Sequence, residues 1–269
     1  MTPQKILHWF WLEPHPAQAE RRVSWPVALL NWALAFLLLG AVCAFSFSQL
    51  RYRWDWQTIG SYQGFFWRGW WHTVGISLVS LVFSLLIGLL TALARRSGWL
   101  VLRALSRLYV ELIRGTPLLV QISFAFYVVA DAFRVENRFV VGVATLSVFT
   151  GAFVGETIRG GIESIGASQL DSARAIGLTR RQTYLYVVFP QAIRVILPAL
   201  AGMFANLIKD SSLLSVISIE DFTWNAQQVA ALTFNHFECY LVLAGGYLVL
   251  TLPVTLGAEY LERRTKYET

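Results

Sequence analysis

Six long runs of apolar residues restrict what this chain can fold into more than any other feature. Each run holds about twenty residues, the length that a helix needs to cross the hydrocarbon core of a bilayer. The expected spans are Val27–Phe47, Trp70–Ala94, Tyr109–Ala130, Phe139–Ile158, Ala192–Ile219 and Cys239–Leu261. The chain is also only 14% charged, about half the usual value for a soluble domain. The sequence therefore predicts an all-α, polytopic membrane helix bundle with six transmembrane helices.

The distribution of basic residues predicts the orientation of these helices. If the N-terminus is cytoplasmic, the internal segments hold sixteen of the 22 Lys and Arg residues, and the outer segments hold five. Cytoplasmic loops normally carry this excess. We therefore expect both termini in the cytoplasm, a polar N-terminal segment at residues 1–26, and a first helix at residues 27–48. That apolar run is too long for the core of a cleavable signal, so it is expected to remain as a membrane anchor.

Glu156 and Arg159 lie at the end of the fourth expected span, three residues apart, so they share a helix face. An ionisable group at membrane depth normally faces the interior of a bundle. Two interpretations stay open. The residues form an ion pair near the cytoplasmic end, or they line a solute path in which the carboxylate meets an ammonium group.

Lys209 and Asp210 pose the same choice in the fifth expected span, and either of them could instead pair with Glu156 across helices. Ser211 and Ser212 add hydroxyl groups at a similar depth. All four are candidates for the solute path. No metal site is predicted, because the two cysteines and four histidines have no metal-ligand spacing.

The internal segment at residues 159–191 is unusually long and carries signs of defined structure. Ser168 followed by Asp171 matches a capping box. A short helix over Gln169–Ile176 is expected to follow, and Gly177 suits the left-handed position that ends a helix.

A second helix is expected after this glycine. Thr179 with Gln182 repeats the capping signature, and Pro190 marks where the helix ends or bends. The apolar groups Leu170, Ala173 and Ile176 would then be exposed. They suit either an amphipathic pair on the membrane surface or a docking element for a soluble partner.

This segment resembles the EAA loop of ABC importer permeases. Asp171, Ser172 and Ala173 stand where that loop has Glu-Ala-Ala, and the spacing to Gly177 and Pro190 is kept. Other motifs are similar to the polar amino-acid uptake branch of that family: Arg114-Gly115-Thr116-Pro117, Glu156 with Arg159-Gly160, and Lys209-Asp210-Ser211-Ser212. The resemblance covers about residues 67–264, which we expect to form the permease domain. That branch usually has five spans, so the helix at residues 27–48 is additional.

The resemblance implies a permease subunit of an ATP-driven importer in the bacterial inner membrane, taking up amino acids by alternating access. A separate ATPase would dock on residues 168–190. The residues implied in this coupling are Ser168, Leu170, Asp171, Ser172, Ala173, Ile176, Gly177 and Pro190. The implied partners are ATPase subunits, a second permease subunit and an extracytoplasmic solute-binding protein.

The chain lacks a Gly-x-x-x-x-Gly-Lys-Ser/Thr loop. We therefore expect ATP and Mg²⁺ to bind the partner ATPase, and no cofactor or enzymatic activity in this chain. The main alternative is a transporter driven by an ion gradient, which would be expected to show two similar halves. An intramembrane enzyme would need a nucleophile and a base within the spans, and a pure scaffold would leave Glu156, Lys209 and Asp210 unexplained.

Overall fold

The expected all-α fold is confirmed. A computed structural model of the chain describes residues 25–49 and 52–265, and these residues form helices and no strand. The chain divides into two compact units, residues 1–53 and residues 54–269. The expected polar segment at residues 1–26 lies almost wholly outside the described residues.

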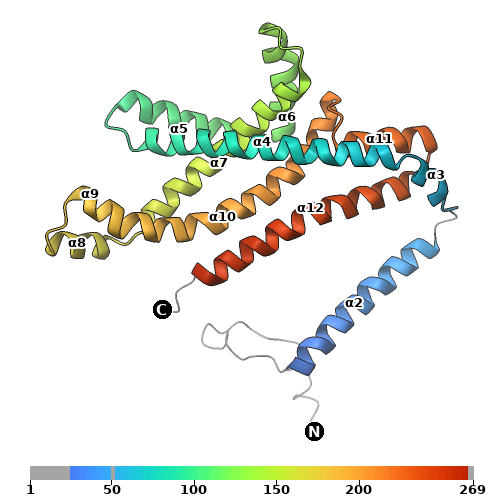
Figure 1. Cartoon of the computed structure of the whole chain (residues 1–269), viewed down its shortest axis with the longest axis horizontal. Coiled ribbons are helices and arrows are strands. Elements are labelled where there is room, and N and C mark those ends of the chain that lie inside the picture. Colours follow the sequence, from blue (N-terminus) through green and yellow to red (C-terminus); the bar gives the residue numbers. More distant parts are fainter. Residues whose placement is uncertain (1–24, 50–51, 266–269) are drawn as a thin grey trace. The chain divides into compact units, whose positions relative to one another are not determined.

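The described residues of the first unit form helix α2 (Trp25–Ser48) (Figure 1). It holds no charged residue, and large apolar side chains such as Leu37 and Phe45 are exposed on it. A helix that is apolar on all sides requires apolar surroundings. Its length and composition are sufficient to cross a membrane, as predicted for the first span.

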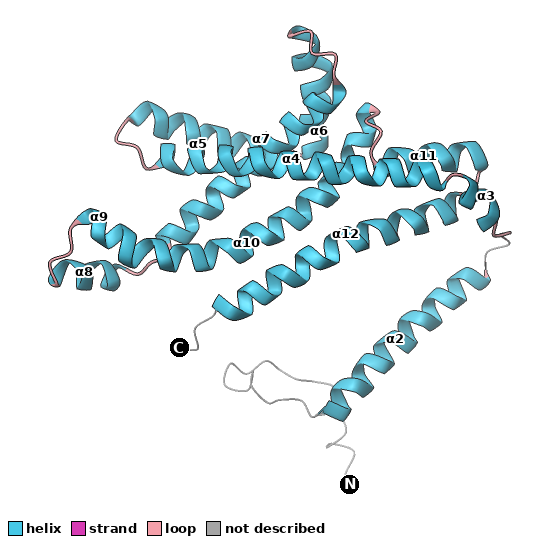
Figure 2. Ribbon diagram, viewed as in Figure 1, coloured by secondary structure: helices cyan, strands magenta, loops and turns pink. Residues whose placement is uncertain are grey.

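The second unit is a set of packed helices (Figure 2). In chain order these are α3 (Trp56–Ser61), α4 (Gln63–Arg95), α5 (Leu100–Gly115), α6 (Leu118–Phe124), η1 (Ala125–Ala130), α7 (Arg138–Glu163), α8 (Ala167–Ala175), α9 (Arg180–Thr183), η2 (Tyr184–Val188), α10 (Phe189–Asp210), η3 (Ser211–Ile217), α11 (Phe222–Thr233) and α12 (His236–Thr265). In the described residues, five helices are long and apolar enough to span a membrane, or six if one bent pair counts as a span.

The third predicted span, Tyr109–Ala130, is wrong in detail because it is not one straight helix. A separate helix, α5, already begins at Leu100, and the chain turns by 108° between α5 and the segment Leu118–Ala130. Thr116 is extended (φ −122°, ψ 145°), because the ring of Pro117 disfavours helical backbone at the residue before it. Gln121 Nε2 then donates to the carbonyl of Ile113 at 2.8 Å. The structure therefore shows a full break at this proline.

Helices α4 and α7 pack closely because glycines lie where their backbones meet. A Cβ atom on Gly88 would lie 2.9 Å from the backbone nitrogen of Gly155, and one on Gly151 would lie 2.9 Å from Cβ of Ile87. Small residues allow such approach between membrane helices. The hydroxyl of Ser147 donates to the carbonyl of Val143 on its own helix at 2.6 Å and lies 3.4 Å from the carbonyl oxygen of Ser80 across the pair. The Gly-x-x-x-Gly pair at Gly151 and Gly155 therefore serves packing within the chain.

The start of α11 is tied to α4 by buried polar groups. The amide of Phe222 donates to Thr73 Oγ1 at 3.0 Å, and Asp221 Oδ1 accepts from the amide of Trp224 at 2.8 Å. Asp221 is 0% exposed, and its Oδ2 atom has no hydrogen-bond partner within the described part of the chain. Asp221 lies between two candidate spans. Burial raises the pKa of its carboxyl to about 7, since low-dielectric surroundings disfavour the charged form.

The glycine contact between α4 and α7 predicts that Gly88→Ala destabilises the protein. The added methyl group meets the backbone of α7, and overpacking of this kind costs about 1–3 kcal/mol. Thermal unfolding in detergent should show a lower midpoint. Gly75→Ala in the same helix is the control, because a Cβ atom there has no neighbour within 4 Å. Equal midpoints for the two variants would contradict the packing.

The burial of Asp221 predicts a pH-dependent stability. Its pKa is raised in the folded state, so folding stabilises the protonated form, and the free energy of unfolding should fall as pH rises from about 4 to about 7. Asp221→Asn should remove this part of the pH dependence, because asparagine also caps a helix and carries no charge. Thermal unfolding of both proteins at several pH values measures it. Identical pH profiles would show that Asp221 does not titrate in this range.

Candidate functional site

The predicted helical hairpin is present, but its first cap is not the one expected. Helix α8 begins at Ala167, its N-cap is Gly166 with extended backbone (φ −60°, ψ 142°), and no side chain caps it. Ser168 already lies inside the helix, so its hydroxyl cannot occupy the capping position. Asp171 instead pairs with Arg174 at 3.0 Å, one turn along the same helix. The predicted capping box of Ser168 and Asp171 is therefore wrong.

The turn after α8 is confirmed as a glycine-dependent helix end. Gly177 has φ +80°, a conformation that side chains with a Cβ atom rarely adopt. Its amide donates to the carbonyl of Arg174 at 2.9 Å, and the amide of Leu178 donates to the carbonyl of Ala173 at 3.1 Å. These two bonds are those of a Schellman motif. The turn is therefore held by the backbone itself.

The second cap is confirmed, and of the two outcomes predicted at Pro190, an end or a bend of the helix, the end is wrong. Thr179 and Gln182 form a capping box, in which the amide of Thr179 donates to Gln182 Oε1 at 2.9 Å. The helix does not stop at Pro190. The π-helical turn η2 leads directly into α10, and Pro190 is the second residue of α10, so this wider turn lets the helix continue past a residue that has no N–H. Arg180–Ile217 thus forms one continuous stretch of 38 residues.

The hairpin presents an apolar groove. A cavity of about 380 Å³ is lined by Ser168, Gln169, Ser172, Ala173, Ile176 and Val187. Ile176 is 76% exposed at its edge, whereas Ala173 is buried in its floor. Of the predicted docking residues, Leu170, Asp171, Gly177 and Pro190 do not line this groove. Figure 1 shows α8 and α9 at the end of α10 that is remote from α11.

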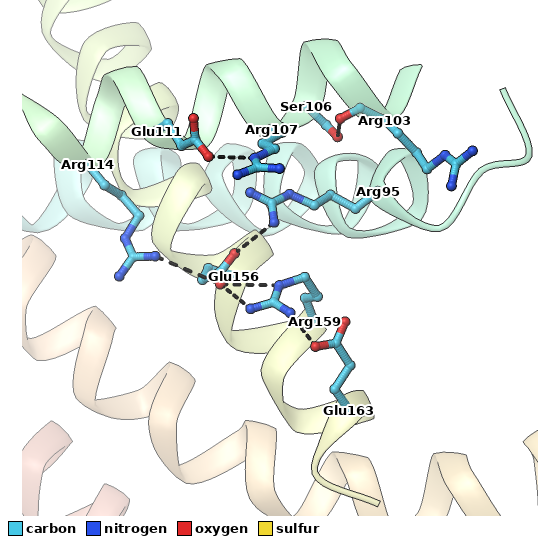
Figure 3. Close-up of polar contacts among 9 residues, drawn as sticks. All are labelled: Arg95, Arg103, Ser106, Arg107, Glu111, Arg114, Glu156, Arg159 and Glu163. Carbon is cyan, nitrogen blue, oxygen red and sulfur yellow. Dashed lines mark hydrogen bonds and ion pairs between the residues drawn. The ribbon is translucent and has the colours of Figure 1, made fainter. Parts of the chain in front are cut away.

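A second candidate site surrounds Glu156, where α4, α5 and α7 meet (Figure 3). Glu156 pairs with Arg159 on its own helix, with Nε to Oε1 at 3.2 Å. It also faces Arg95 from α4 at 3.6 Å and Arg114 from α5 at 3.9 Å. The predicted ion pair of Glu156 and Arg159 is therefore present, but it belongs to a larger cluster.

This cluster borders a polar cavity of about 580 Å³. Its lining residues are Arg95, Arg107, Val110, Glu111, Arg114, Gly115, Phe153, Glu156 and Arg159. Neither Arg95 nor Arg107 was predicted from the sequence to be a site residue. The signal for Arg107 is the spacing of Arg107, Glu111 and Arg114, which puts them on one helix face. Nothing in the sequence indicates that Arg95 meets them, because that depends on α5 returning alongside α4.

Among residues 25–49 and 52–265, neither Lys209 nor Asp210 forms an ion pair with Glu156. They lie in the last turn of α10, where Lys209 is exposed and Asp210 half-buried. Ser211 is buried and donates to the carbonyl of Ile208 at 2.7 Å. Ser212 is half-buried. The predicted solute-path residues therefore fall into two separate groups.

Comparison with known proteins identifies related sequences over most of the chain. Residues 84–267 match the family model described as binding-protein-dependent transport system inner membrane component. The "Probable glutamine ABC transporter permease protein GlnM" of Bacillus subtilis is 38% identical over 197 residues, covering 73% of this chain and 91% of the relative. The L-cystine transport system permease protein TcyB of Bacillus subtilis is 36% identical over 198 residues, covering 73% and 84%.

A solved structure has the same fold at comparable identity. A chain from the crystal structure of an amino acid ABC transporter with histidines superposes with a TM-score of 0.74 and 34% identity, covering 79% of this chain and 100% of that chain. The region that matches the family model, residues 84–267, includes the lining residues of both candidate sites. The chain belongs to the family of binding-protein-dependent transport system inner membrane components.

Proposed function

We propose that this chain is the permease subunit of an ATP-driven importer that takes up amino acids delivered by an extracytoplasmic binding protein. The observation that carries this proposal is the capped hairpin at one end of a 38-residue helical stretch, in a chain whose relatives are permeases of glutamine and cystine systems. An ion-gradient-driven transporter has no support among these relatives, whose names describe permease proteins of ABC and amino-acid transport systems.

In this proposal the groove on α8 receives a side chain of a separate ATPase subunit, which binds ATP and Mg²⁺. The exposed Ile176 is the apolar contact at its edge. The Schellman turn at Gly177 and the capping box at Thr179 hold the hairpin in one shape. The hairpin can therefore transmit a displacement of the ATPase without deforming.

The displacement would pass from the hairpin into α10 and then into α7. A Cβ atom on Gly161 of α7 would lie 2.9 Å from Cδ1 of Ile196 of α10. Movement of α10 therefore acts directly on the helix that carries Glu156. Two permease chains, moved by two ATPases, would then expose a central path to either side of the membrane in turn.

The orientation belongs to the same proposal. Both termini and the hairpin lie in the cytoplasm, and the membrane is the bacterial inner membrane. The distribution of Lys and Arg supports this arrangement. The aromatic groups Trp67, Trp70 and Trp71, which contact one another near the start of α4, suit the opposite membrane interface.

The proposed transport activity predicts ATP-dependent uptake. The complex purified from native membranes, reconstituted in vesicles with its binding protein, should accumulate one or more of the twenty common amino acids. Accumulation should require ATP and Mg²⁺ on the cytoplasmic side. Radiolabelled uptake measures it, and a vesicle with an ion gradient but no ATP is the control. Uptake driven by the gradient alone would refute an ATP-driven mechanism.

The proposed docking predicts that Ile176→Asp uncouples the ATPase from the permease. The variant should fold normally, because this side chain is exposed, but a charge at the groove edge opposes apolar docking. The purified complex should lose most of its ATPase subunit and its uptake. Ile176→Leu keeps an apolar group of equal size and should behave as wild type. Full ATPase association in Ile176→Asp would place the docking surface elsewhere.

A further inference from the structure

The cavity between α4, α5 and α7 has an excess of positive charge. Four arginines and two glutamates line it: Arg95, Arg107, Arg114, Arg159, Glu111 and Glu156. These groups come from three helices and face one another in Figure 3. A cavity of about 580 Å³ lies in the range of small-molecule sites. Its charge selects the kind of solute group that can enter.

Both carboxylates of the lining already have a near cationic partner. Glu111 pairs with Arg107 at 2.6 Å, and Glu156 pairs with Arg159. Arg159 in turn also contacts Glu163. Glu156 Oε2 is itself buried without a hydrogen-bond partner among the described residues, but an ammonium group that approached it would also meet four guanidinium groups in the same lining. Such a group is not favoured there.

Arg95 and Arg114 are less fully paired. Their contacts to Glu156 are long, at 3.6 and 3.9 Å, beyond hydrogen-bond distance. The Nε atom of Arg95 is buried and has no hydrogen-bond partner among the described residues. Arg114 lies over the ring of Phe153, with Cζ at 5.3 Å from the ring centroid. Both guanidinium groups thus retain N–H groups that can donate hydrogen bonds to an anionic ligand.

We propose that Arg95 and Arg114 bind the α-carboxylate of the transported amino acid at this cavity, and that Glu156 holds these arginines in place rather than binding the solute's ammonium group. The proposal rests on the proposed function, and it assigns the solute chemistry of the cavity. A guanidinium group matches a carboxylate through two parallel hydrogen bonds. Glu156 keeps the arginines close together when the cavity is empty. The α-carboxylate of the solute then accepts hydrogen bonds from the guanidinium N–H groups that these long contacts leave free.

The first test uses the wild-type permease–ATPase complex without binding protein, so that only the permease selects the solute. The probe is the radiolabelled amino acid that the reconstituted complex takes up fastest. Its analogue without the amino group should compete for binding, whereas its α-carboxamide should compete at least about tenfold less well, as expected for loss of a charged hydrogen-bond acceptor. Equal competition by the carboxamide would overturn the proposal even if ATP-driven uptake is established.

The second test uses matched variants of α5. Arg114→Gln should weaken binding of the probe about tenfold or more and raise the KM of uptake, and Arg114→Lys should give an intermediate effect because one point charge replaces two parallel bonds. Arg103→Gln is the control, because Arg103 is exposed on the same helix and does not line the cavity. It should leave binding and uptake unchanged. Wild-type affinity in Arg114→Gln would contradict the assignment.

A lipid phosphate is the other anion that could enter a basic cavity near a membrane surface. Binding of the probe is therefore repeated in phosphatidylcholine vesicles with and without phosphatidylglycerol. Under the proposal the Arg114→Gln defect is the same in both. A defect that appears only with phosphatidylglycerol would assign the cavity to lipid headgroups and overturn the solute assignment.

Discussion

The close approach of α4 and α7 is the interaction on which the rest of the second unit depends. In a membrane, apolar side chains gain little by leaving lipid for one another, so helices associate through close packing and a few polar contacts. Gly88, Gly151 and Gly155 allow the two backbones to meet, and the hydroxyl of Ser147 makes a polar contact with the carbonyl oxygen of Ser80 at 3.4 Å. This pair positions Arg95 at the end of α4 opposite Glu156 on α7. The cavity between α4, α5 and α7 exists because this packing brings Arg95 of α4 and Glu156 of α7 together.

The two candidate sites are linked through a single helix. The hairpin leads directly into α10, and α10 meets α7 at Gly161 and Ile196, slightly more than one turn from Glu156. A displacement at the hairpin therefore reaches the cavity through packed backbone rather than through a flexible loop. Under the proposed function, this is how ATP hydrolysis in a partner changes the surroundings of a solute. The long contacts of Arg95 and Arg114 to Glu156 are the ones most easily exchanged during such movement.

Local sequence signals predicted local structure well where one residue type has a strong physical preference. Gly177 adopts the left-handed conformation expected of it, and Thr179 with Gln182 forms the expected capping box. Ser168 shows the limit of such signals. Its spacing to Asp171 matches a capping box, but Gly166 and Ala167 allow the helix to begin earlier. Pro190 shows the same limit, because a π turn lets the helix continue past it.

The sequence by itself determined the membrane class, the approximate spans, and the hairpin with its glycine turn. Apolar length, charge and backbone preference act over short distances along the chain, so they can be read without knowing the fold. Only the tertiary structure decided that Tyr109–Ala130 is broken at Pro117 and that α5 returns alongside α4. That return brings Arg95, Arg114 and Glu156 together from three helices, and leaves Lys209 and Asp210 outside the cluster. Which charges meet depends on helix packing, and no spacing along the chain encodes it.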